Sequence, residues 1–397
     1  MDDLLLVGGG IGGLSAALAL GQLGTPSRLL EQSAEFNQLG AGIGLGPNAL
    51  HRLHAWGLAP ALKQHGFMPA QLQVRDAASG RSLGQLALAS SFERRYGAPY
   101  MTIHRADLHR VLLDAVQAQG LAQLHLSHEV LRLQDQAQGV QLAVRQPGQA
   151  QADWHAGAVL GGDGVASVVR QKVWGAQGLR MTRHLAYRSM VARHLLPAVW
   201  RDDDIGLWLG QRLHLVHYPV SGGEWLNLVL LLESSDPIEA TGWDHQRSHE
   251  QTSADLAMAL RGSCSRLQDL VHRVERWRAW ALFDRDPLQG PSDMVRGRVA
   301  LLGDAAHPML PYLAQGAGMA IEDADSLAWH WQQAGMSIEQ RLLAYAKARW
   351  RRVARVQSRA RHNAHLFHAS GALAWARDLG MQLGGRTVMD IPWLYGH

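Results

Sequence analysis

Short apolar runs alternate with amphipathic stretches along the chain, and this pattern predicts strands and helices in alternation. The run Leu4–Val7 is too short for a helix and stops at a cluster of glycines. A helical pattern of small apolar residues follows over residues 16–23, and a second apolar run ends at Glu31. This order of strand, glycine turn, helix and strand is typical of the first βαβ unit of an α/β fold.

The glycine cluster matches the pattern Gly-x-Gly-x-x-Gly, and each of its three glycines has a physical reason. Gly8 allows a tight turn, Gly10 lets the backbone approach a pyrophosphate, and Gly13 lets the helix pack closely against the strand. The helix N-terminus offers free N–H groups and a positive dipole end to phosphates. Glu31 follows the last glycine by about 20 residues, where a carboxylate can bind a ribose hydroxyl. A glycine turn alone can be only a turn, but the ordered set predicts a dinucleotide-binding unit.

The rest of the chain supplies a second, strand-rich region and a helical end. In chain order, we expect a glycine-rich connection over residues 39–48, a hairpin over 71–88, a helix from residue 105, a strand–turn–strand unit over 124–144, an antiparallel meander over 185–232, a helix over 253–283, an apolar strand over 296–302 and one long helix from residue 338. These elements divide into a nucleotide-binding domain of residues 1–70, 100–180 and 285–335, a substrate-binding sheet domain of residues 71–99 and 181–284, and a C-terminal helical segment of residues 336–397. The nucleotide-binding core is therefore interrupted by the sheet domain.

Composition places the chain among globular proteins with a sizeable core. Hydrophobic residues make up 47% and charged residues 18% of its 397 residues, enough for two domains that share a cleft. Cys264 is the only cysteine, which excludes an internal disulfide and a cysteine-clustered metal site and fits a reducing cytosol. No signal peptide and no apolar run of roughly 20 residues is visible, so we expect a cytoplasmic protein without a membrane span or a metal centre.

The net charge of +4 raises the question of a nucleic-acid partner. The positive charge is almost all arginine, and it is spread along the chain. Its one dense block, residues 347–361, has helical spacing and is interpreted as a solvated helix face, with an anionic surface or partner as the alternative. We expect no nucleic-acid binding, and a mild positive charge favours small acidic substrates by electrostatic steering.

Three further features carry candidate cofactor chemistry. Asp163 stands between glycines at the end of an apolar strand, where α/β folds bind ligands, and Asp304 follows another strand in a similar way. The glycine-rich stretch from Gly316 opens a helix whose N-terminus can stabilise a negative charge. Arg105 lies in the first turn of a helix, where a cation is mildly unfavourable. It is therefore predicted to reach a cofactor, with a surface arginine as the alternative.

Strand alternation assigns sides within residues 213–220 of the meander. His214, Val216 and Tyr218 share one face, and His217 points to the other. The spacing alone leaves two interpretations open. The histidine and tyrosine are either core and rim residues or two polar groups aimed at a ligand.

Three separated elements agree in order and spacing: the first glycine motif with Glu31, the glycine-flanked Asp163, and Gly303-Asp304 followed by an alanine pair, His307 and Pro308. With them the chain resembles the FAD-dependent single-component aromatic hydroxylases, the family of 4-hydroxybenzoate hydroxylase. Each motif occurs in other flavoproteins, but the three together are specific, and the resemblance covers essentially the whole chain. It implies an α/β fold in which a Rossmann-like FAD-binding domain of the GR2 type is interrupted by a mixed-sheet substrate domain and followed by a long C-terminal helix.

The resemblance also implies where FAD binds. The aspartate at 304 holds the ribityl chain, the element around Asp163 serves FAD and the passing nicotinamide, and Arg105 contacts the ribityl and pyrophosphate region. The helix start at residues 316–319 faces the pyrimidine edge of the isoalloxazine. The full set of expected cofactor-binding residues is Gly8, Gly10, Ile11, Gly12, Gly13, Glu31, Gln32, Gly42, Arg105, Val130, Asp163, Asp304, Gly316, Ala317, Gly318 and Met319.

Within the family, residues 214–219, 312–317 and 393–396 resemble the 3-hydroxybenzoate 6-hydroxylases, which form gentisate. There the residues matching His214 and Tyr218 bind and activate the phenol. The expected substrate-binding residues are Val216, Pro311, Tyr312 and Gly44. Two positions depart from that group, which carries glutamine where this chain has Pro311 and tends to carry glutamine at Gly44. Proline at the first position resembles salicylate 1-hydroxylases, which form catechol. A histidine at the second, as in 6-hydroxynicotinate relatives, is absent, so the ring substrate stays open.

The resemblance further implies a mechanism. NADH or NADPH binds transiently and reduces FAD, and dioxygen then forms a flavin hydroperoxide that hydroxylates an aromatic acid with an ionised phenol. The pKa of a phenol lies about three units above neutrality, so a base is needed, and His214 is the expected one beside Tyr218. Pro308 is expected near the flavin. A homodimer is left open, and a non-catalytic flavin-binding sensor is the remote alternative.

Overall fold

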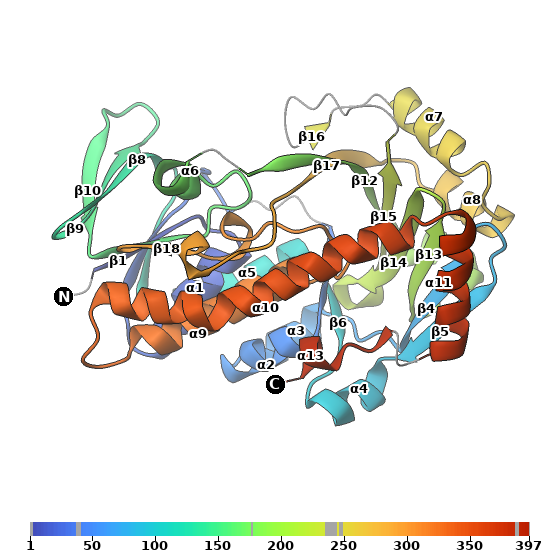
Figure 1. The fold of residues 1–397 in the computed structure, drawn as a ribbon, viewed down its shortest axis with the longest axis horizontal. Coiled ribbons are helices and arrows are strands. Elements are labelled where there is room, and N and C mark those ends of the chain that lie inside the picture. The colour runs from blue at the N-terminus through green and yellow to red at the C-terminus, as the bar shows by residue number, and fades with distance from the viewer. Residues whose placement is uncertain are drawn as a thin grey trace.

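A computed structural model describes residues 3–36, 41–175, 178–234, 244–245, 249–385 and 389–396. Its first layer is a buried six-stranded sheet in the order β18-β19-β11-β1-β2-β7 (Figure 1). These strands are β1 (Leu4–Val7), β2 (Ser27–Leu30), β7 (Ala122–His125), β11 (Ala158–Gly161), β18 (Val295–Arg296) and β19 (Val299–Leu301). All neighbours pair in parallel except β18 and β19. Parallel strands covered by helices are buried on both faces, which explains their continuous apolar runs.

The second layer is an eight-stranded sheet in the order β16-β17-β12-β15-β14-β13-β4-β5. Its strands are β4 (Gln71–Asp76), β5 (Ser82–Ala87), β12 (Arg180–Ala192), β13 (Ile205–Gly210), β14 (Leu213–Val220), β15 (Trp225–Glu233), β16 (Asp244–His245) and β17 (Arg278–Asp284). The hairpin expected over residues 71–88 joins this sheet through a parallel pairing of β4 with β13. The chain therefore leaves the nucleotide-binding sheet twice to build one mixed sheet, which is the fold class predicted from the sequence.

Two smaller sheets complete the strands. β3 (Gly42–Leu45) pairs with β6 (Met101–His104), and β8 (Glu129–Gln136), β9 (Gly139–Arg145) and β10 (Ala152–Ala156) form a three-stranded sheet. β8 and β9 confirm a strand–turn–strand unit within the expected range 124–144, but its first residues, 124 and 125, belong to β7 of the six-stranded sheet. Residues 39 and 40 of the expected glycine-rich connection lie outside the described residues, and the part that follows them forms β3 and leads into a helix.

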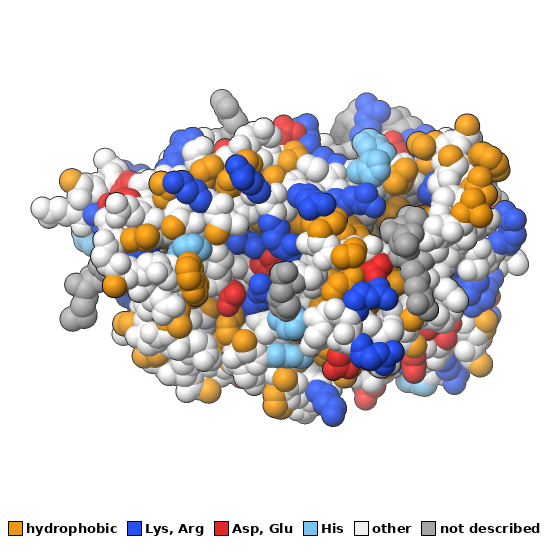
Figure 2. All heavy atoms as spheres, turned by 60° about the horizontal axis from the view of Figure 1, so that its bottom comes forward, with side chains coloured by type: hydrophobic (Ala, Val, Ile, Leu, Met, Phe, Trp, Pro, Cys, Tyr) orange, Lys and Arg blue, Asp and Glu red, His pale blue; other side chains and the backbone are white. Residues whose placement is uncertain are grey.

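The helices are α1 (Ile11–Gln22), α2 (Pro47–Ala55), α3 (Ala59–His65), α4 (Ala89–Tyr96), α5 (Arg105–Gln119), α6 (Val168–Trp174), α7 (His249–Ala259), α8 (Ser265–His272), α9 (Gly316–Trp331), α10 (Ile338–Phe367), α11 (Gly371–Gly384) and α13 (Pro392–Tyr395). Among the described residues, no helix combines the length and apolar character needed to cross a lipid bilayer. Lys and Arg side chains are scattered over the face in Figure 2, with acidic and hydrophobic side chains between them.

Helix α10 ties the two main sheets together. It begins beside α9, next to the six-stranded sheet, and runs across the molecule to the eight-stranded sheet (Figure 1). A reciprocal capping box starts it, because Ser337 and Gln340 exchange side-chain and backbone hydrogen bonds of 3.3 and 2.9 Å. Residues near its two ends can therefore serve two different parts of one site.

Two element predictions are wrong in part. Residues 253–283 were expected as one helix, but only α7 and α8 are helical, and 278–284 form strand β17. This segment pairs with β12 and buries Ala279 and Ala281 against the sheet, so the tertiary pairing decides its conformation. The long helix from residue 338 also ends early, at Phe367, and Gly371 then turns the chain with a φ of 57°.

Candidate active site

The glycine turn after β1 has the geometry of a phosphate-binding turn. Gly8 has a φ of 100°, and a Cβ there would lie 2.7 Å from the carbonyl oxygen of Gly162. A Cβ on Gly13 would overlap the carbonyl oxygen of Gly8, so helix and strand are in close contact. A Cβ on Gly10 would meet no atom within 4 Å. The open side of the turn therefore lies at Gly10, where the backbone can approach a ligand.

Glu31 is held beside this turn. Its carboxylate accepts hydrogen bonds from the backbone N–H groups of Gly9, at 2.7 Å, and Ser33, at 2.9 Å. Gln32 is exposed next to it. Val130 has its side chain in the core, so only its backbone is available to a ligand. An ordered carboxylate at the end of β2 fits a ribose hydroxyl.

Asp163 faces its own helix. Its carboxylate accepts hydrogen bonds from the Ser167 hydroxyl, at 2.6 Å, and from the backbone N–H of Val169, at 3.0 Å. Burial raises the pKa of this carboxyl, and these hydrogen bonds oppose the rise. Arg170 on the same helix donates to the carbonyl oxygens of Ala305 and Ala306. The motif around Asp163 thus caps α6 and clamps it to the segment that carries Asp304.

Asp304, just after β19, and Arg105, at the start of α5, are near enough for the charge of each to affect the pKa of the other. The Asp304 side chain is exposed, yet desolvation raises the pKa of its carboxyl, with His307 and Arg105 opposing the rise. Burial lowers the pKa of Arg105, and the charge of Asp304 opposes that shift. An acceptor and a cation here fit the hydroxyls and phosphates of an FAD molecule.

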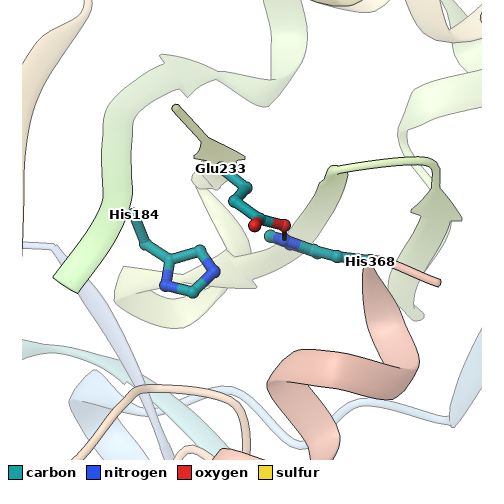
Figure 3. Close-up of side chains that lie close together, drawn as sticks. All are labelled: His184, Glu233 and His368. Carbon is teal, nitrogen blue, oxygen red and sulfur yellow. Dashed lines mark ion pairs between the residues drawn. The ribbon is translucent and has the colours of Figure 1, made fainter. Parts of the chain in front are cut away.

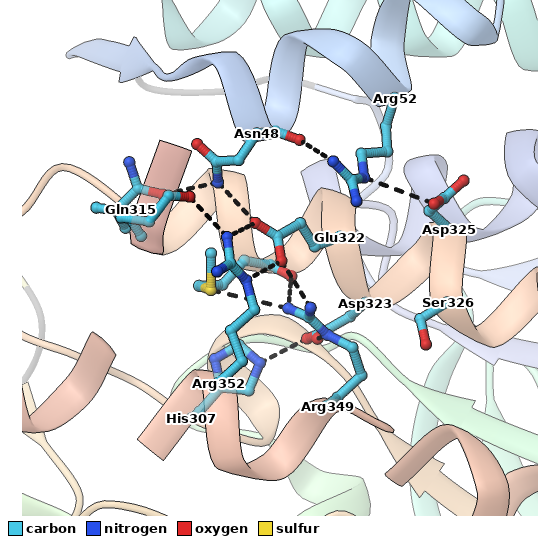
Figure 4. A network of polar contacts seen from close by, with 12 residues as sticks. Asn48, Arg52, His307, Gln315, Glu322, Asp323, Asp325, Ser326, Arg349 and Arg352 are labelled. Carbon is cyan, nitrogen blue, oxygen red and sulfur yellow. Dashed lines mark hydrogen bonds and ion pairs between the residues drawn. The ribbon is translucent and has the colours of Figure 1, made fainter. Parts of the chain in front are cut away.

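A buried ionic network fixes the N-terminal end of α9 (Figure 4). Glu322 accepts hydrogen bonds from Arg349 at 2.6 Å, from Arg352 at 2.7 Å and from Asn48 at 2.7 Å. Burial alone would raise the pKa of Glu322, but the two arginines outweigh it and hold the pKa at about 2. The carboxylate is therefore ionised near neutral pH, and its hydrogen bonds tie the N-terminal half of α9 to α2 and α10.

Asp323 extends this network to the Asp304 segment. It accepts hydrogen bonds from the backbone N–H of Gly303 at 3.1 Å, from His307 Nε2 at 2.5 Å and from Arg349 Nε at 2.7 Å. Arg349 is only 6% exposed. Interpreting residues 347–361 as a solvated face is therefore wrong for Arg349, because two carboxylates of α9 draw its charge into the core.

The predicted sides of β14 are confirmed. Val216 and the ring of His214 lie toward the cluster that contains Tyr312, whereas His217 packs on the opposite face with its ring centroid 5.4 Å from that of Trp200. Burial lowers the pKa of His217 to about 3. His217 is therefore a neutral core residue, and the other side of the strand carries the candidate chemistry.

His214 lies in a buried aromatic enclosure. Its ring centroid is 4.8 Å from that of Tyr312 and 5.4 Å from that of Phe367, and its Nδ1 lies 2.9 Å from Nε2 of His368. Burial, together with the neighbouring His368, lowers the pKa of His214 well below its ordinary value. Within the described residues, no hydrogen bond reaches its Nε2. His214 is thus a neutral imidazole with one nitrogen held and the other free, an arrangement suited to a base.

Phe367 and His368 were missed by the sequence reasoning. They lie at the end of α10, and His368 is 154 residues beyond His214, which it contacts. A helical segment rich in arginine and histidine offers no local signal for this contact.

Tyr218 is positioned by the strand β3. A Cβ on Gly42 would lie 2.6 Å from Tyr218 Cε2, and the N–H of Gly42 donates to Asn227 Oδ1 at 2.7 Å. A Cβ on Gly44 would overlap the hydroxyl of Tyr100, whose pKa burial raises to about 12. The Tyr100 hydroxyl therefore fills the space that a side chain at position 44 would take. Tyr100 was not among the residues expected from the sequence.

A hollow of about 320 Å³ lies next to Gly42, with Ala41, Asn227, Met190 and Arg188 among its lining residues. Arg188 extends from β12, and its guanidinium carbon lies 5.2 Å from the ring centroid of Trp280. Burial lowers the pKa of Arg188. Tyr218 opposes this shift, and the charge of Arg105 adds to it. Among the described residues, no carboxylate pairs with it. Arg188 is thus a desolvated cation in a hollow, suited to an anionic ligand.

The loop from Pro308 to Tyr312 is held by α10. Gln357 donates to the carbonyl oxygen of Pro308 at 3.3 Å, and Asn363 donates to that of Tyr312 at 3.1 Å. Pro308 is buried, whereas Pro311 is exposed. The structure thus brings Tyr312 next to His214 and leaves Pro311 at the edge of the enclosure.

Comparisons with known proteins agree over the whole chain. The family profile described as FAD binding domain matches residues 2–360. A 3-hydroxybenzoate 6-hydroxylase from Aquipseudomonas alcaligenes is 38% identical over 100% of this chain and 98% of its own length. A 6-hydroxynicotinate 3-monooxygenase from Pseudomonas fluorescens is 32% identical, covering 99% of this chain and 94% of its own length.

Solved structures have the same fold. Klebsiella pneumoniae HpxO complexed with FAD and uric acid superimposes with a TM-score of 0.85 at 24% identity, covering 98% of this chain and 94% of HpxO. A salicylate hydroxylase substrate complex superimposes with a TM-score of 0.78 at 22% identity, covering 98% and 96% of the two chains.

Proposed function

Because this chain belongs to the FAD-dependent aromatic hydroxylases, we propose that it hydroxylates 3-hydroxybenzoate at carbon 6 to give gentisate. The observation that carries the proposal is His214, a neutral imidazole with a free Nε2 on the strand face that also bears Tyr218. The relatives named 3-hydroxybenzoate 6-hydroxylase support the substrate. The co-substrates are NADH or NADPH and dioxygen.

The residues of the expected cofactor site fit FAD. The open turn at Gly10 and the N–H groups at the start of α9 would face its phosphates and its isoalloxazine, and Glu31 would accept from a ribose hydroxyl. Asp304 and Arg105 would hold the chain between them. Bound FAD supplies the redox chemistry, passing electrons from the nicotinamide to dioxygen and one oxygen atom to the ring.

The protein's own part in the reaction is to ionise and hold the phenol. The pKa of a phenol is about 10, so few molecules are ionised near neutral pH. Nε2 of His214 accepts the phenol proton, and a base of this kind contributes about 10²–10⁴-fold to the rate. Burial raises the pKa of Tyr218, so its hydroxyl stays protonated and donates a hydrogen bond to the phenolate. Val216, Tyr312 and Leu310 keep water from this side.

Arg188 is the proposed anchor for the substrate carboxylate. Its charge is desolvated and has no carboxylate partner among the described residues, and it lines the hollow beside Gly42. An arginine can bind a carboxylate through two parallel hydrogen bonds. An aromatic acid held there would have its carboxylate near Arg188 and its ring on the strand face of Tyr218.

Salicylate is a second candidate substrate, because this chain departs from the 3-hydroxybenzoate group at positions 311 and 44. Pro311 lies at the edge of the enclosure, where proline resembles the salicylate 1-hydroxylases, and the Tyr100 hydroxyl fills the place of a side chain at Gly44. In that reaction hydroxylation displaces the carboxylate and gives catechol.

The test is NADH consumption by the FAD-loaded protein with 3-hydroxybenzoate, salicylate and 6-hydroxynicotinate, each product being identified by mass and retention. Gentisate from 3-hydroxybenzoate is the expected result. Catechol from salicylate would transfer the proposal to the second candidate, and no stimulation by any aromatic acid would contradict a hydroxylase function.

A cytoplasmic location and a homodimer are further parts of the proposal. The single cysteine fits a reducing compartment. For the dimer, α11 presents large apolar side chains at helical spacing, with Trp375 69% and Leu383 80% exposed. Sedimentation of the wild type and of Trp375→Glu is the measurement, with a monomeric variant expected.

A further inference from the structure

From His214, a chain of polar side chains leads toward the surface. His368, from the end of α10, contacts His214. Glu233, from the end of β15, and His184, from β12, lie beside His368 (Figure 3). The ligand atoms of these last three side chains all lie within 4.8 Å of one another. The proposed function uses His214 but assigns no part to the groups behind it.

The hydrogen bond between the two imidazoles has two arrangements. At 2.9 Å between Nδ1 of His214 and Nε2 of His368, one nitrogen carries a hydrogen and the other offers a lone pair. If His368 were the donor, a neutral His214 would carry its hydrogen on Nε2 and could not accept a proton there. If His214 is the donor, its Nε2 lone pair is free for the phenol.

Glu233 selects the second arrangement. Its Oε2 lies 3.9 Å from Nδ1 of His368, a buried nitrogen with no hydrogen-bond partner among the described residues. A carboxylate on this side favours a hydrogen on Nδ1, which leaves the lone pair of His368 on Nε2, facing His214. The 3.9 Å gap is too long for a direct hydrogen bond and fits a bridging water molecule.

We propose that His368 and Glu233 form a proton relay that holds His214 in its basic tautomer and carries the phenol proton from the buried site to solvent. The proposal rests on the hydroxylase function above. In the forward step the phenol O–H bond breaks and His214 Nε2 gains the proton, while the Nδ1 proton of His214 passes to His368 Nε2. His368 then releases its Nδ1 proton to Glu233 or water, so one proton leaves the phenol and one reaches solvent.

The surroundings fit transfer rather than storage of the charge. His368 is 6% exposed, and burial is the main cause that lowers its pKa to about 3, with smaller contributions from His184, Arg212 and Arg377. A proton that arrives there therefore moves on. The Glu233 side chain is 38% exposed and forms the solvent end.

His184 faces the outside of the same cluster. It lines an outer hollow of about 340 Å³ together with His365 and Asp284, which also influence its titration. Tyr312 completes the groups around His368, with its hydroxyl 3.5 Å from Nε2. Water in the outer hollow would therefore reach the relay without entering the substrate side.

The experiment compares His368→Ala with the matched control His362→Ala, an exposed histidine on the same helix. Both are assayed as FAD-loaded protein between pH 6 and pH 10, with and without added imidazole, using the substrate that the wild type hydroxylates. We expect His368→Ala to lower kcat about 10²-fold at pH 7 with little change in KM, since the substrate contacts remain. Imidazole, or a pH at which the phenol ionises unaided, should restore much of kcat, and Glu233→Gln should lose less.

Several outcomes would overturn the relay. An unchanged kcat and pH profile in His368→Ala would remove it, and so would a loss that neither alkaline pH nor imidazole restores, because that marks a structural role. Activity abolished by a chelator and restored by Zn²⁺ at one ion per chain would assign the three side chains to a metal ion instead. If the wild type is inactive with every aromatic acid, that result would contradict the proposed hydroxylase function itself.

Discussion

Helix α10 contributes to two buried polar clusters of opposite character. Near its middle, Arg349 and Arg352 meet Glu322 and Asp323 in a network of paired charges. At its end, His368 meets His214 in a cluster of neutral rings. The first cluster holds full charges because each is matched by a partner. The second cluster holds neutral rings, because burial lowers the pKa of both histidines.

This difference in charge suits the ionic network to positioning groups and the histidine pair to transferring a proton. With the pKa of Glu322 at about 2, the ionic network keeps one protonation state near neutral pH and can only position groups. A neutral imidazole pair can accept and pass a proton, since each ring has a donor and an acceptor nitrogen. The network therefore supports the proposed cofactor site, and the histidine pair supports the proposed chemistry. Both contacts depend on one helix spanning the two sheets.

The largest expected effect comes from breaking the ionic network. Arg349→Ala leaves two buried carboxylates without their main partner, and breaking a buried pair costs about 3–5 kcal/mol. We expect a strongly lowered melting temperature and loss of FAD, because the α9 start and the Gly303 segment are no longer fixed. The matched control is Arg351→Ala, an exposed arginine on the same helix. Equal FAD content in the two variants would show that the ionic network is not needed for the cofactor site.

His214→Ala tests the other cluster. We expect product formation to fall about 10²–10⁴-fold while the protein stays folded and loaded with FAD, because only the base is removed. NADH oxidation should continue with more hydrogen peroxide formed per NADH. The measurement is the ratio of product to NADH consumed, and full coupling in this variant would exclude His214 as the base.

Arg188 differs from both clusters, because it is a half-buried cation with no carboxylate partner among the described residues. We propose that the substrate supplies the carboxylate that α9 supplies to Arg349. Arg188→Ala should raise the dissociation constant of the aromatic acid about 10–100-fold, from the loss of about 1.5–3 kcal/mol for a hydrogen bond to a charged group. Titration of the flavin absorbance measures it. Arg276→Ala, at the exposed rim of the same hollow, is the control.

The smallest effect is expected at Gly44. A Cβ there overlaps the Tyr100 hydroxyl, so Gly44→Ala should raise KM several-fold by shifting that side chain. Removing the hydroxyl gives the methyl group room, and the double variant Gly44→Ala/Tyr100→Phe should bind substrate better than Gly44→Ala alone. Strictly additive effects in this double-mutant cycle would mean that the two positions do not share one space.

Local patterns determined a large part of this protein. The first βαβ unit, its glycine turn with Glu31, the hairpin that joins the larger sheet and the sides of β14 follow from neighbouring residues, since turn geometry and side-chain alternation act within a few positions. The same patterns identified Asp304, Arg105 and His214 as candidates. They misread residues 278–284, where pairing with β12 outweighs the helical appearance of the segment.

Only the tertiary structure decided which charges are buried and which groups meet. The arginine block reads as a solvated face because nothing near it in the chain is acidic, and its partners Glu322 and Asp323 come from the preceding helix. His368, the partner of His214, lies 154 residues away in the chain. The space beside Gly44 is filled by Tyr100, which comes from another segment. A pKa depends on burial and on neighbours in space, so the sequence alone names the titratable groups, whereas packing decides whether each holds a charge or moves a proton.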